Sequence, residues 1–155
     1  MTWIKPLFGW MMHRSGWASK PGQERILAIE IGRAGFEWAL GHSCLSHLTP
    51  GQQATPEAWS AAMAASPVRI QWDPDRSLTG DQLAHRAIQV GLSCDAVRRY
   101  ADEWIRSLSD ITDLVHRIRQ LLRAGLITEA SRELPAERVY PLGPALGGRI
   151  GADAG

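Results

Sequence analysis

The sequence VRIQWDPDR at residues 68–76 decides the fold class, because it gives the clearest strand signal in the chain. Its first five residues alternate between apolar and polar side chains, which is the two-residue period of a strand with one buried face. We predict that Pro74 ends this strand, since proline has no backbone N–H to donate to a sheet. A second strand is predicted over residues 87–92.

The segments around these strands predict a mixed architecture. The apolar run at residues 26–29 lacks alternation and is typical of a central strand that is covered on both faces. A short strand is expected at residues 2–5. Helix signals occur at residues 7–13, 35–42, 55–65, 93–108, 110–125 and 128–134.

Apolar residues gather on one side of the predicted helices at 93–108 and 110–125, so these two are expected to form a C-terminal amphipathic pair. A loop rich in Gly, Gln and Pro is expected before residue 55. The fold class predicted from these elements is α+β, with a small central β-sheet flanked by helices.

Length and composition predict one domain. The chain has 155 residues, of which 45% are hydrophobic, enough for one continuous core. We expect a single α+β domain over residues 1–142 and a Gly-rich, disordered tail over residues 143–155. The longest apolar stretches fall short of the roughly 20 residues that cross a bilayer, so we expect no membrane partner.

Charge and cysteine content restrict the binding partners and the cellular location that we expect. The 17 basic and 16 acidic residues give a net charge of only +1, so any site for nucleic acid must be local. Cys44 and Cys94 form no Cys-x-x-Cys pattern, and no signal peptide opens the sequence. A reducing, cytoplasmic location is therefore expected.

Several common classes of enzyme lack their motifs here. The sequence has no Gly-x-Ser-x-Gly, His-Glu-x-x-His, Gly-x-x-x-x-Gly-Lys or Gly-x-Gly-x-x-Gly segment. His42, Cys44 and His47 lie close together, with Cys94 as a conceivable fourth ligand, but their spacing matches no established zinc pattern. We therefore expect no metal.

Two aspartates at the end of the strand quoted above allow two interpretations. Asp73 and Asp75 could form a catalytic carboxylate group, or they could belong to an ordinary Asp-Pro-Asp turn.

The opening block at residues 3–17 carries the densest signal. It holds three of the seven tryptophans together with two methionines, a composition that suits a bulky core segment. The same block suits an aromatic wall for a planar base. In that interpretation Trp10 belongs to the stacking surface, and Lys5, Arg14 and Ser15 are placed to meet phosphate.

The same block carries a resemblance to a known family. Residues 1–29 resemble the bacterial and fungal family of unknown function designated DUF4291, and further similar segments lie at 42–47, 68–76, 86–92 and 100–105. Members of that family normally carry some tens of residues before this point, including a strand with the sequence Tyr-Gln-Ala-Tyr and a helix. By this resemblance we expect one strand of the sheet to be missing. The family implies no established activity.

The order of elements is also similar to that of ADP-ribosyltransferases of the DNA-modifying toxin type. By this analogy Lys5, Trp10, Arg14 and Ser15 stand at an NAD pocket, and Gln23 lies at the adjoining turn. Asp73 takes the place of the usual catalytic glutamate and stabilises the oxocarbenium-like ribose, although its shorter side chain shifts the carboxylate by about one methylene. The implied function is an NAD-binding transferase that acts on nucleic acid or protein.

Two other functions remain open from the sequence. The first is a non-catalytic nucleotide- or RNA-binding module that uses the same aromatic wall with local arginines. The second is an interaction protein whose C-terminal helices dock a partner.

Overall fold

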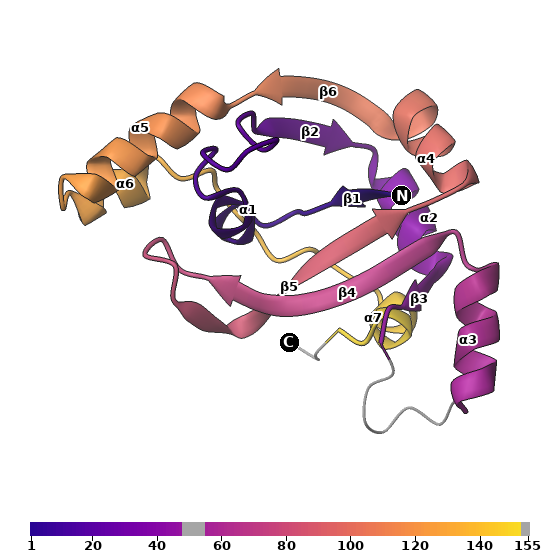
Figure 1. The fold of residues 1–155 in the computed structure, drawn as a ribbon. Coiled ribbons are helices and arrows are strands. Elements are labelled where there is room, and N and C mark those ends of the chain that lie inside the picture. The colour runs from indigo at the N-terminus through magenta and orange to yellow at the C-terminus, as the bar shows by residue number, and fades with distance from the viewer. Residues whose placement is uncertain (48–54, 153–155) are drawn as a thin grey trace.

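The strands form two separate sheets (Figure 1). The computed structural model describes residues 1–47 and 55–152, so most of the loop predicted before residue 55 lies outside the described residues. In spatial order the larger sheet contains β1 (Thr2–Ile4), β5 (Gln82–Leu92), β4 (Val68–Arg76) and β3 (Ser43–Leu45); the smaller contains β2 (Leu27–Ile31) and β6 (Ile105–Asp110). The predicted α+β class is confirmed.

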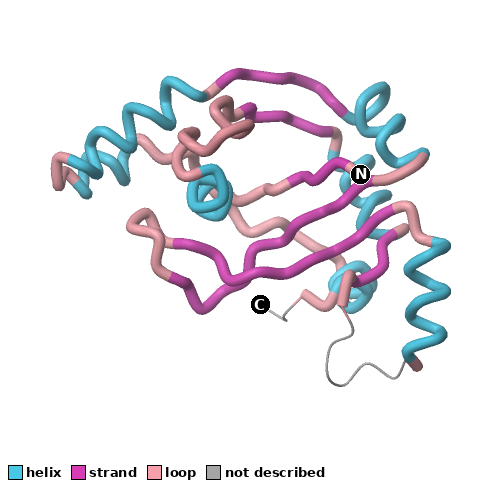
Figure 2. Tube along the Cα trace, in the orientation of Figure 1, coloured by secondary structure: helices cyan, strands magenta, loops and turns pink. Residues whose placement is uncertain are grey.

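Most helices lie at the ends of the sheets, whereas the first lies between them (Figure 2). The helices are α1 (Phe8–Ser15), α2 (Arg33–Gly41), α3 (Pro56–Ala65), α4 (Asp95–Arg99), the π-helical turn η1 (Tyr100–Trp104), α5 (Thr112–Arg123), α6 (Ile127–Arg132) and α7 (Pro144–Ile150). The helices predicted at 7–13, 35–42, 55–65, 110–125 and 128–134 are confirmed with small shifts of their bounds. Within the described ranges, no helix is long and apolar enough to cross a membrane.

The larger sheet contains the main hydrophobic core. β4 runs antiparallel to β5 with Ile70 opposite Val90, and it runs parallel to β3. Ile70, Val90 and their neighbours Val68 and Leu92 are almost completely buried. Each such side chain contributes about 1.5–3 kcal/mol when it leaves water, so this sheet holds much of the stability.

Pro74 does not end β4, contrary to the prediction. It pairs with Arg86 of β5, and the register shifts between Pro74 and Arg76. An irregularity of this kind in the pairing is one of the places where a strand tolerates a residue without an N–H.

The prediction of a central, doubly covered strand at 26–29 is wrong in its position. β2 is present, but it belongs to the two-stranded sheet, and Leu27 and Ile29 are 46% and 37% exposed. Within the described residues, no third strand pairs with this sheet.

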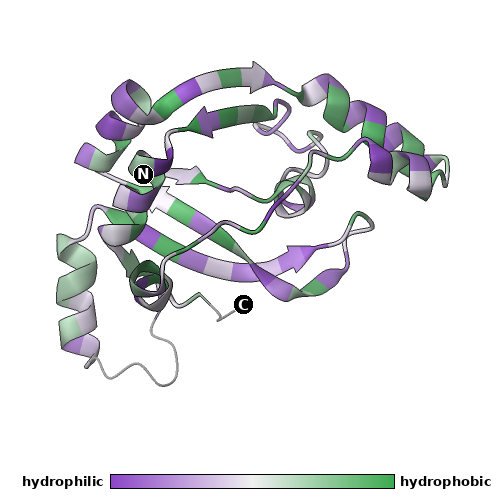
Figure 3. Cartoon of the chain, turned by 180° about the vertical axis from the view of Figure 1, so that it is seen from behind, coloured by the Kyte–Doolittle hydropathy of each residue, from purple (hydrophilic) through white to green (hydrophobic). Residues whose placement is uncertain are grey.

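The helix predicted over residues 93–108 is also wrong in its second half. The helical segment ends at Trp104, and β6 follows it and pairs antiparallel with β2, placing Leu108 opposite Ile29. Pairing with β6 satisfies the backbone groups of β2, which outweighs the helical periodicity of the sequence. The amphipathic pair at this end of the chain is instead α5 and α6, whose apolar and polar residues alternate in bands (Figure 3).

The tail expected to be disordered over residues 143–155 is ordered in its described part. α7 buries Ile150, which is only 2% exposed. The indole Nε1 of Trp72 donates a hydrogen bond to the carbonyl of Ile150 at 2.6 Å, and Arg86 donates to the carbonyl of Gly151 at 2.8 Å. These contacts fix the helix against β4 and β5. Residues 153–155 lie outside the described residues.

Candidate functional site

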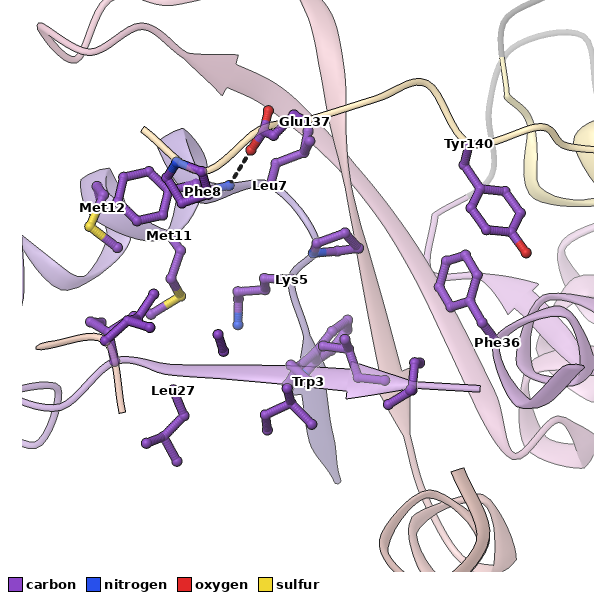
Figure 4. A pocket seen from close by; sticks show the side chains of 18 of the residues that line it. Trp3, Lys5, Leu7, Phe8, Met11, Met12, Leu27, Phe36, Glu137 and Tyr140 are labelled. Atoms are coloured by element: carbon purple, nitrogen blue, oxygen red, sulfur yellow. Dashed lines mark hydrogen bonds between the residues drawn. The ribbon is translucent and has the colours of Figure 1, made fainter. Parts of the chain in front are cut away.

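A cavity of about 730 Å³ lies between the two sheets, and we call it the cleft. Its walls come from β1, α1, β2, α2 and residues 135–140, which we call the strap. The strap leads from α6 toward α7 (Figure 3). Most lining side chains are apolar or aromatic, and they include Trp3, Phe8, Met11, Leu27, Phe36 and Tyr140 (Figure 4). A volume of this size suits a small molecule rather than a single ion.

The position of α1 depends on a glycine. A Cβ atom at Gly9 would overlap the carbonyl oxygen of Arg76, so the helix can lie this close to β4 only because residue 9 has no side chain. At its other end, Gly16 has φ +60° and closes the helix with hydrogen bonds to the carbonyls of Met12 and His13. The sequence thus places the first turn of α1 at the edge of the cleft.

Lys5 is the predicted site residue that lines the cleft. Its half-buried side chain extends into the space between α1 and β2 (Figure 4). The ammonium lies 5.1 Å from the centroid of the Trp10 ring, within the range of a cation–π interaction. Burial lowers the pKa of Lys5 from its ordinary 10.5, repulsion by Arg14 lowers it further, and attraction to Asp73 opposes both.

Asp73 lies beside Lys5 but does not line the cleft. Its Oδ1 accepts a hydrogen bond from the amide of Gln71 at 3.0 Å, and its Oδ2 accepts one from the amide of Gln89. Gln89 is itself buried. Asp73 is therefore held by two amides on the face of β4 and β5 that packs toward α1, where its charge reaches Lys5.

The other residues predicted to bind a ligand do not line the cleft. Trp10 is buried beneath Lys5. The carbonyl of Arg14 accepts a hydrogen bond from Lys20 at 2.9 Å. Ser15 is fully buried, and its hydroxyl accepts from the Ala18 N–H in the turn after α1.

Gln23 lies farther along the same turn. Its N–H donates to the carbonyl of Lys20 at 2.9 Å. The structure therefore places Lys5, Trp10 and Asp73 near one another and leaves Ser15 at the end of α1 and Gln23 in the segment that follows.

The strap contributes residues that sequence reasoning missed. Glu137 accepts a hydrogen bond from the Phe8 N–H at 2.8 Å, which places a carboxylate at the N-terminus of α1, where the helix dipole favours negative charge (Figure 4). These two residues are far apart in the sequence, and no motif connects them.

Tyr140 fixes the other end of the strap against α2. Its hydroxyl donates to Glu37 at 2.9 Å, its ring meets Phe36 edge to face, and the Arg33 guanidinium lies 5.3 Å from its centroid. Burial, followed by the hydrogen bond to Glu37, raises the pKa of Tyr140. A tyrosine in a segment rich in Pro and Gly was the one available sequence signal for this contact.

Of the residues considered as metal ligands, His42 is engaged in other contacts. The His42 ring stacks on Trp38 with centroids 3.9 Å apart, and its Nδ1 lies 2.8 Å from the carbonyl of residue 38. Cys44 and Cys94 are both free thiols. In the part of the chain that the structure describes, no group of three or more His, Cys, Asp or Glu side chains could hold a metal ion.

Comparison with known proteins gives one match. A family model described as "Domain of unknown function (DUF4291)" matches residues 1–140. No curated protein and no solved structure matches the chain. The analogy to ADP-ribosyltransferases thus gains no support from the comparisons.

Proposed function

The chain belongs to the DUF4291 family of unknown function, and from the geometry of its cleft we propose that it binds a nucleotide there, with NAD as the candidate ligand. The observation that carries this proposal is Lys5. A half-buried ammonium at the wall of a cavity that is otherwise mostly apolar and aromatic is a costly arrangement, and an anionic ligand group would offset the cost.

The charges around the cleft favour an anion. Lys5 and Arg33 are the cations that line it, and Glu137 is the acid. The carboxylate of Glu137 already accepts the hydrogen bond of an N-terminal helix N–H. A phosphate or pyrophosphate would therefore meet two cations and one carboxylate that already accepts a hydrogen bond from the N-terminus of α1.

The aromatic residues favour a planar group next to that anion. Phe8 lies at one end of the cleft, and Phe36 with Tyr140 lies at the other, with Lys5 between them (Figure 4). Stacking of a base on an aromatic ring contributes about 1–3 kcal/mol and tolerates different bases. The combination of a stacking surface and a central cation fits a nucleotide better than an aliphatic acid.

Transfer of ADP-ribose is the catalytic extension of this proposal. In that reaction the bond between ribose C1′ and nicotinamide breaks, nicotinamide leaves with the bonding electrons, and an acceptor nucleophile forms the new bond at C1′. Asp73 is the carboxylate proposed to stabilise the intermediate charge. Its position outside the lining requires that the ribose reach the face of β4 on which Gln71 and Gln89 hold Asp73.

Calorimetric titration with NAD, ADP and AMP tests the binding proposal. We expect saturable binding by the wild type and a loss of about 10- to 100-fold in affinity for Lys5→Met, because a hydrogen bond to a charged group contributes about 1.5–3 kcal/mol. Lys20→Met is the matched control, because it removes the other lysine of the chain, which is exposed and donates to a backbone carbonyl. Affinity for Lys20→Met should equal that of the wild type.

The remaining functions give different results in the same experiment. An RNA-binding module would bind oligonucleotides with a steep salt dependence and give no saturation with NAD. Release of nicotinamide, followed by chromatography, reports the transfer step separately, and it should be lost in Asp73→Asn while NAD binding persists. Failure of the wild type to bind any of the three nucleotides would overturn the proposal.

A further inference from the structure

A second cavity of about 360 Å³ lies on the other side of Phe8 and Glu137, which line both cavities. It is lined by the first turn of α1, by the end of the β4–β5 hairpin, by Leu134 and by the first residue of the strap, Pro135. Lys5, Trp10, Arg14, Ser15, Gln23 and Asp73 do not line it, whereas Asp75 does. Its most unusual feature is a buried carboxylate.

That carboxylate belongs to Asp75 of β4, which lies where the pairing with β5 is irregular. Pro74 pairs with Arg86 whereas Arg76 pairs with Gln82, and irregularities of this kind commonly turn a side chain toward a functional site. The residue is only 4% exposed, and it lines the second cavity. Oδ2 lies 3.0 Å from Nε2 of His85, whose side chain is 66% exposed.

The other oxygen of Asp75 is unsatisfied. Oδ1 is buried and has no hydrogen-bond partner among the described residues. Leaving a buried polar atom unpaired costs about 1–3 kcal/mol, and more for a charged group. An ionised carboxylate can only accept hydrogen bonds, so the partner that satisfies Oδ1 must carry N–H or O–H groups.

From this geometry we propose that the second cavity is a binding site for a small organic cation with N–H donors, a primary ammonium or a guanidinium, held by the carboxylate of Asp75. A cation supplies both the donor that Oδ1 lacks and the opposite charge that a buried carboxylate needs. Histidine at Oδ2 completes the carboxylate's hydrogen bonding on its exposed side. The cavity is large enough for the alkyl part of such a ligand as well as its charged group.

The remaining walls agree with this ligand class. Phe8 and Trp17 line the cavity with their rings edge to face and 6.2 Å apart, and aromatic faces attract cations. Glu137 adds a second carboxylate. The positive residue at the wall is Arg76, whose guanidinium donates to the carbonyl of Gly80 at 3.3 Å and so is engaged with the hairpin turn.

An ordered water and a metal ion are the other species that could meet a carboxylate. A single water would satisfy Oδ1 but would leave most of the 360 Å³ unexplained. Within the described ranges, no cluster of three or more His, Cys, Asp or Glu side chains could hold a metal ion. The apolar and aromatic walls favour an organic ligand.

Titration with propylguanidinium and propylammonium, followed by calorimetry in the absence of any nucleotide, tests the proposal. Tetramethylammonium is the chemical control, because it carries the charge but has no N–H group. We expect the first two cations to bind saturably and tetramethylammonium to bind at least tenfold more weakly. Because no nucleotide is present, the result is independent of whether the cleft binds NAD.

Asp75→Asn is the informative variant, since it keeps the size of the side chain and removes its charge. We expect at least a tenfold loss of affinity for propylguanidinium, while the melting temperature stays equal or rises because an unsatisfied buried charge has been removed. Asp95→Asn removes an exposed carboxylate elsewhere and should bind like the wild type. The proposal is overturned if the wild type binds neither N–H cation, if tetramethylammonium binds equally well, or if folded Asp75→Asn keeps its affinity.

Discussion

The two sheets of this protein use apolar residues in opposite ways. In the larger sheet, Ile70 and Val90 face each other across β4 and β5 and are sealed from water. In the smaller sheet, Leu27, Ile29 and Leu108 remain more than a third exposed. The first sheet builds a core, whereas the second forms one wall of the cleft.

This difference shows that an apolar strand is not by itself a sign of a structural core. Leu27 and Ile29 line the cleft together with residues of β1 and α1. Their exposure has a cost that packing does not recover, and exposed apolar surface of this kind commonly marks a binding site. The proposed ligand would cover it.

Truncating one isoleucine in each sheet gives the largest expected difference between the closed core and the cleft wall. Ile70→Ala should lower the free energy of unfolding by about 2–5 kcal/mol, because it leaves a cavity in a closed core. Ile29→Ala should cost only about 1 kcal/mol, since its side chain is already partly in water. Urea denaturation measures both values, and equal losses would contradict the assignment of β2 to a cleft wall.

The next largest loss of stability is expected where α2 packs against Trp104, between the two sheets. A Cβ at Gly35 of α2 would overlap the indole of Trp104, which is buried just before β6 begins. Gly35→Ala should therefore cost about 1–3 kcal/mol through overpacking. Gly41→Ala in the same helix meets only Leu146 at 3.7 Å and should be neutral or stabilising by about 0.5–1 kcal/mol. The melting temperatures of the two variants, compared with that of the wild type, test this prediction. Equal melting temperatures for the two variants would contradict it.

Asp110, at the end of β6, gives a smaller and pH-dependent effect. Hydrogen bonds from the side chain and backbone N–H of Thr112, together with Arg25 at 2.5 Å, lower the pKa of Asp110 from 3.8 to about 2. A lowered carboxyl pKa stabilises the fold above pH 3.8, and this contribution is lost as the pH falls toward 2. Asp110→Ala should melt a few degrees below the wild type at neutral pH, with the gap narrowing between pH 3.8 and 2. A gap that stays constant over this range would contradict the assignment.

The smallest effect is a gain in stability. Because burial lowers the pKa of Lys5, its charged form is less favourable in the folded state than in the unfolded state. Lys5→Met should therefore raise the melting temperature slightly at neutral pH. The gain should disappear as the pH rises from the lowered pKa of the folded state toward 10.5. A lower melting temperature for this variant would show that Lys5 serves the fold rather than a ligand.

β4 and α3 were predictable because their signals are local. The alternation in residues 68–72 and the capping threonine at Thr55, whose hydroxyl accepts from the Ala58 N–H, act over a few residues. β3, in the same sheet as β4, was not predicted. The helix over 93–108 was mispredicted because Val97 and Trp104 keep a helical period up to the residue before β6. Only the distant partner β2 turns the following residues into a strand.

In the candidate site, too, local signals were predictable and contacts between distant segments were not. Lys5 was predictable from an unusual local mixture of aromatic and basic residues. Glu137 and Tyr140 were not, because their contacts with Phe8 and Glu37 join segments more than a hundred residues apart. Asp75 was considered either as part of a catalytic carboxylate group or as a turn residue, but the burial of its free oxygen depends on the irregular pairing of β4 with β5 and on the approach of α1.

The most direct test of the central claim is NMR of the protein labelled with 13C at the lysine Cε atoms. The chain has only two lysines, so Lys5 and Lys20 give two signals, and Lys20 is the internal control. The account predicts that Lys5 titrates below pH 10.5 and that NAD shifts the Lys5 signal, raises its pKa and leaves Lys20 unchanged. A Lys5 signal that does not respond to NAD, or that moves by the same amount as Lys20, would contradict a nucleotide-binding cleft.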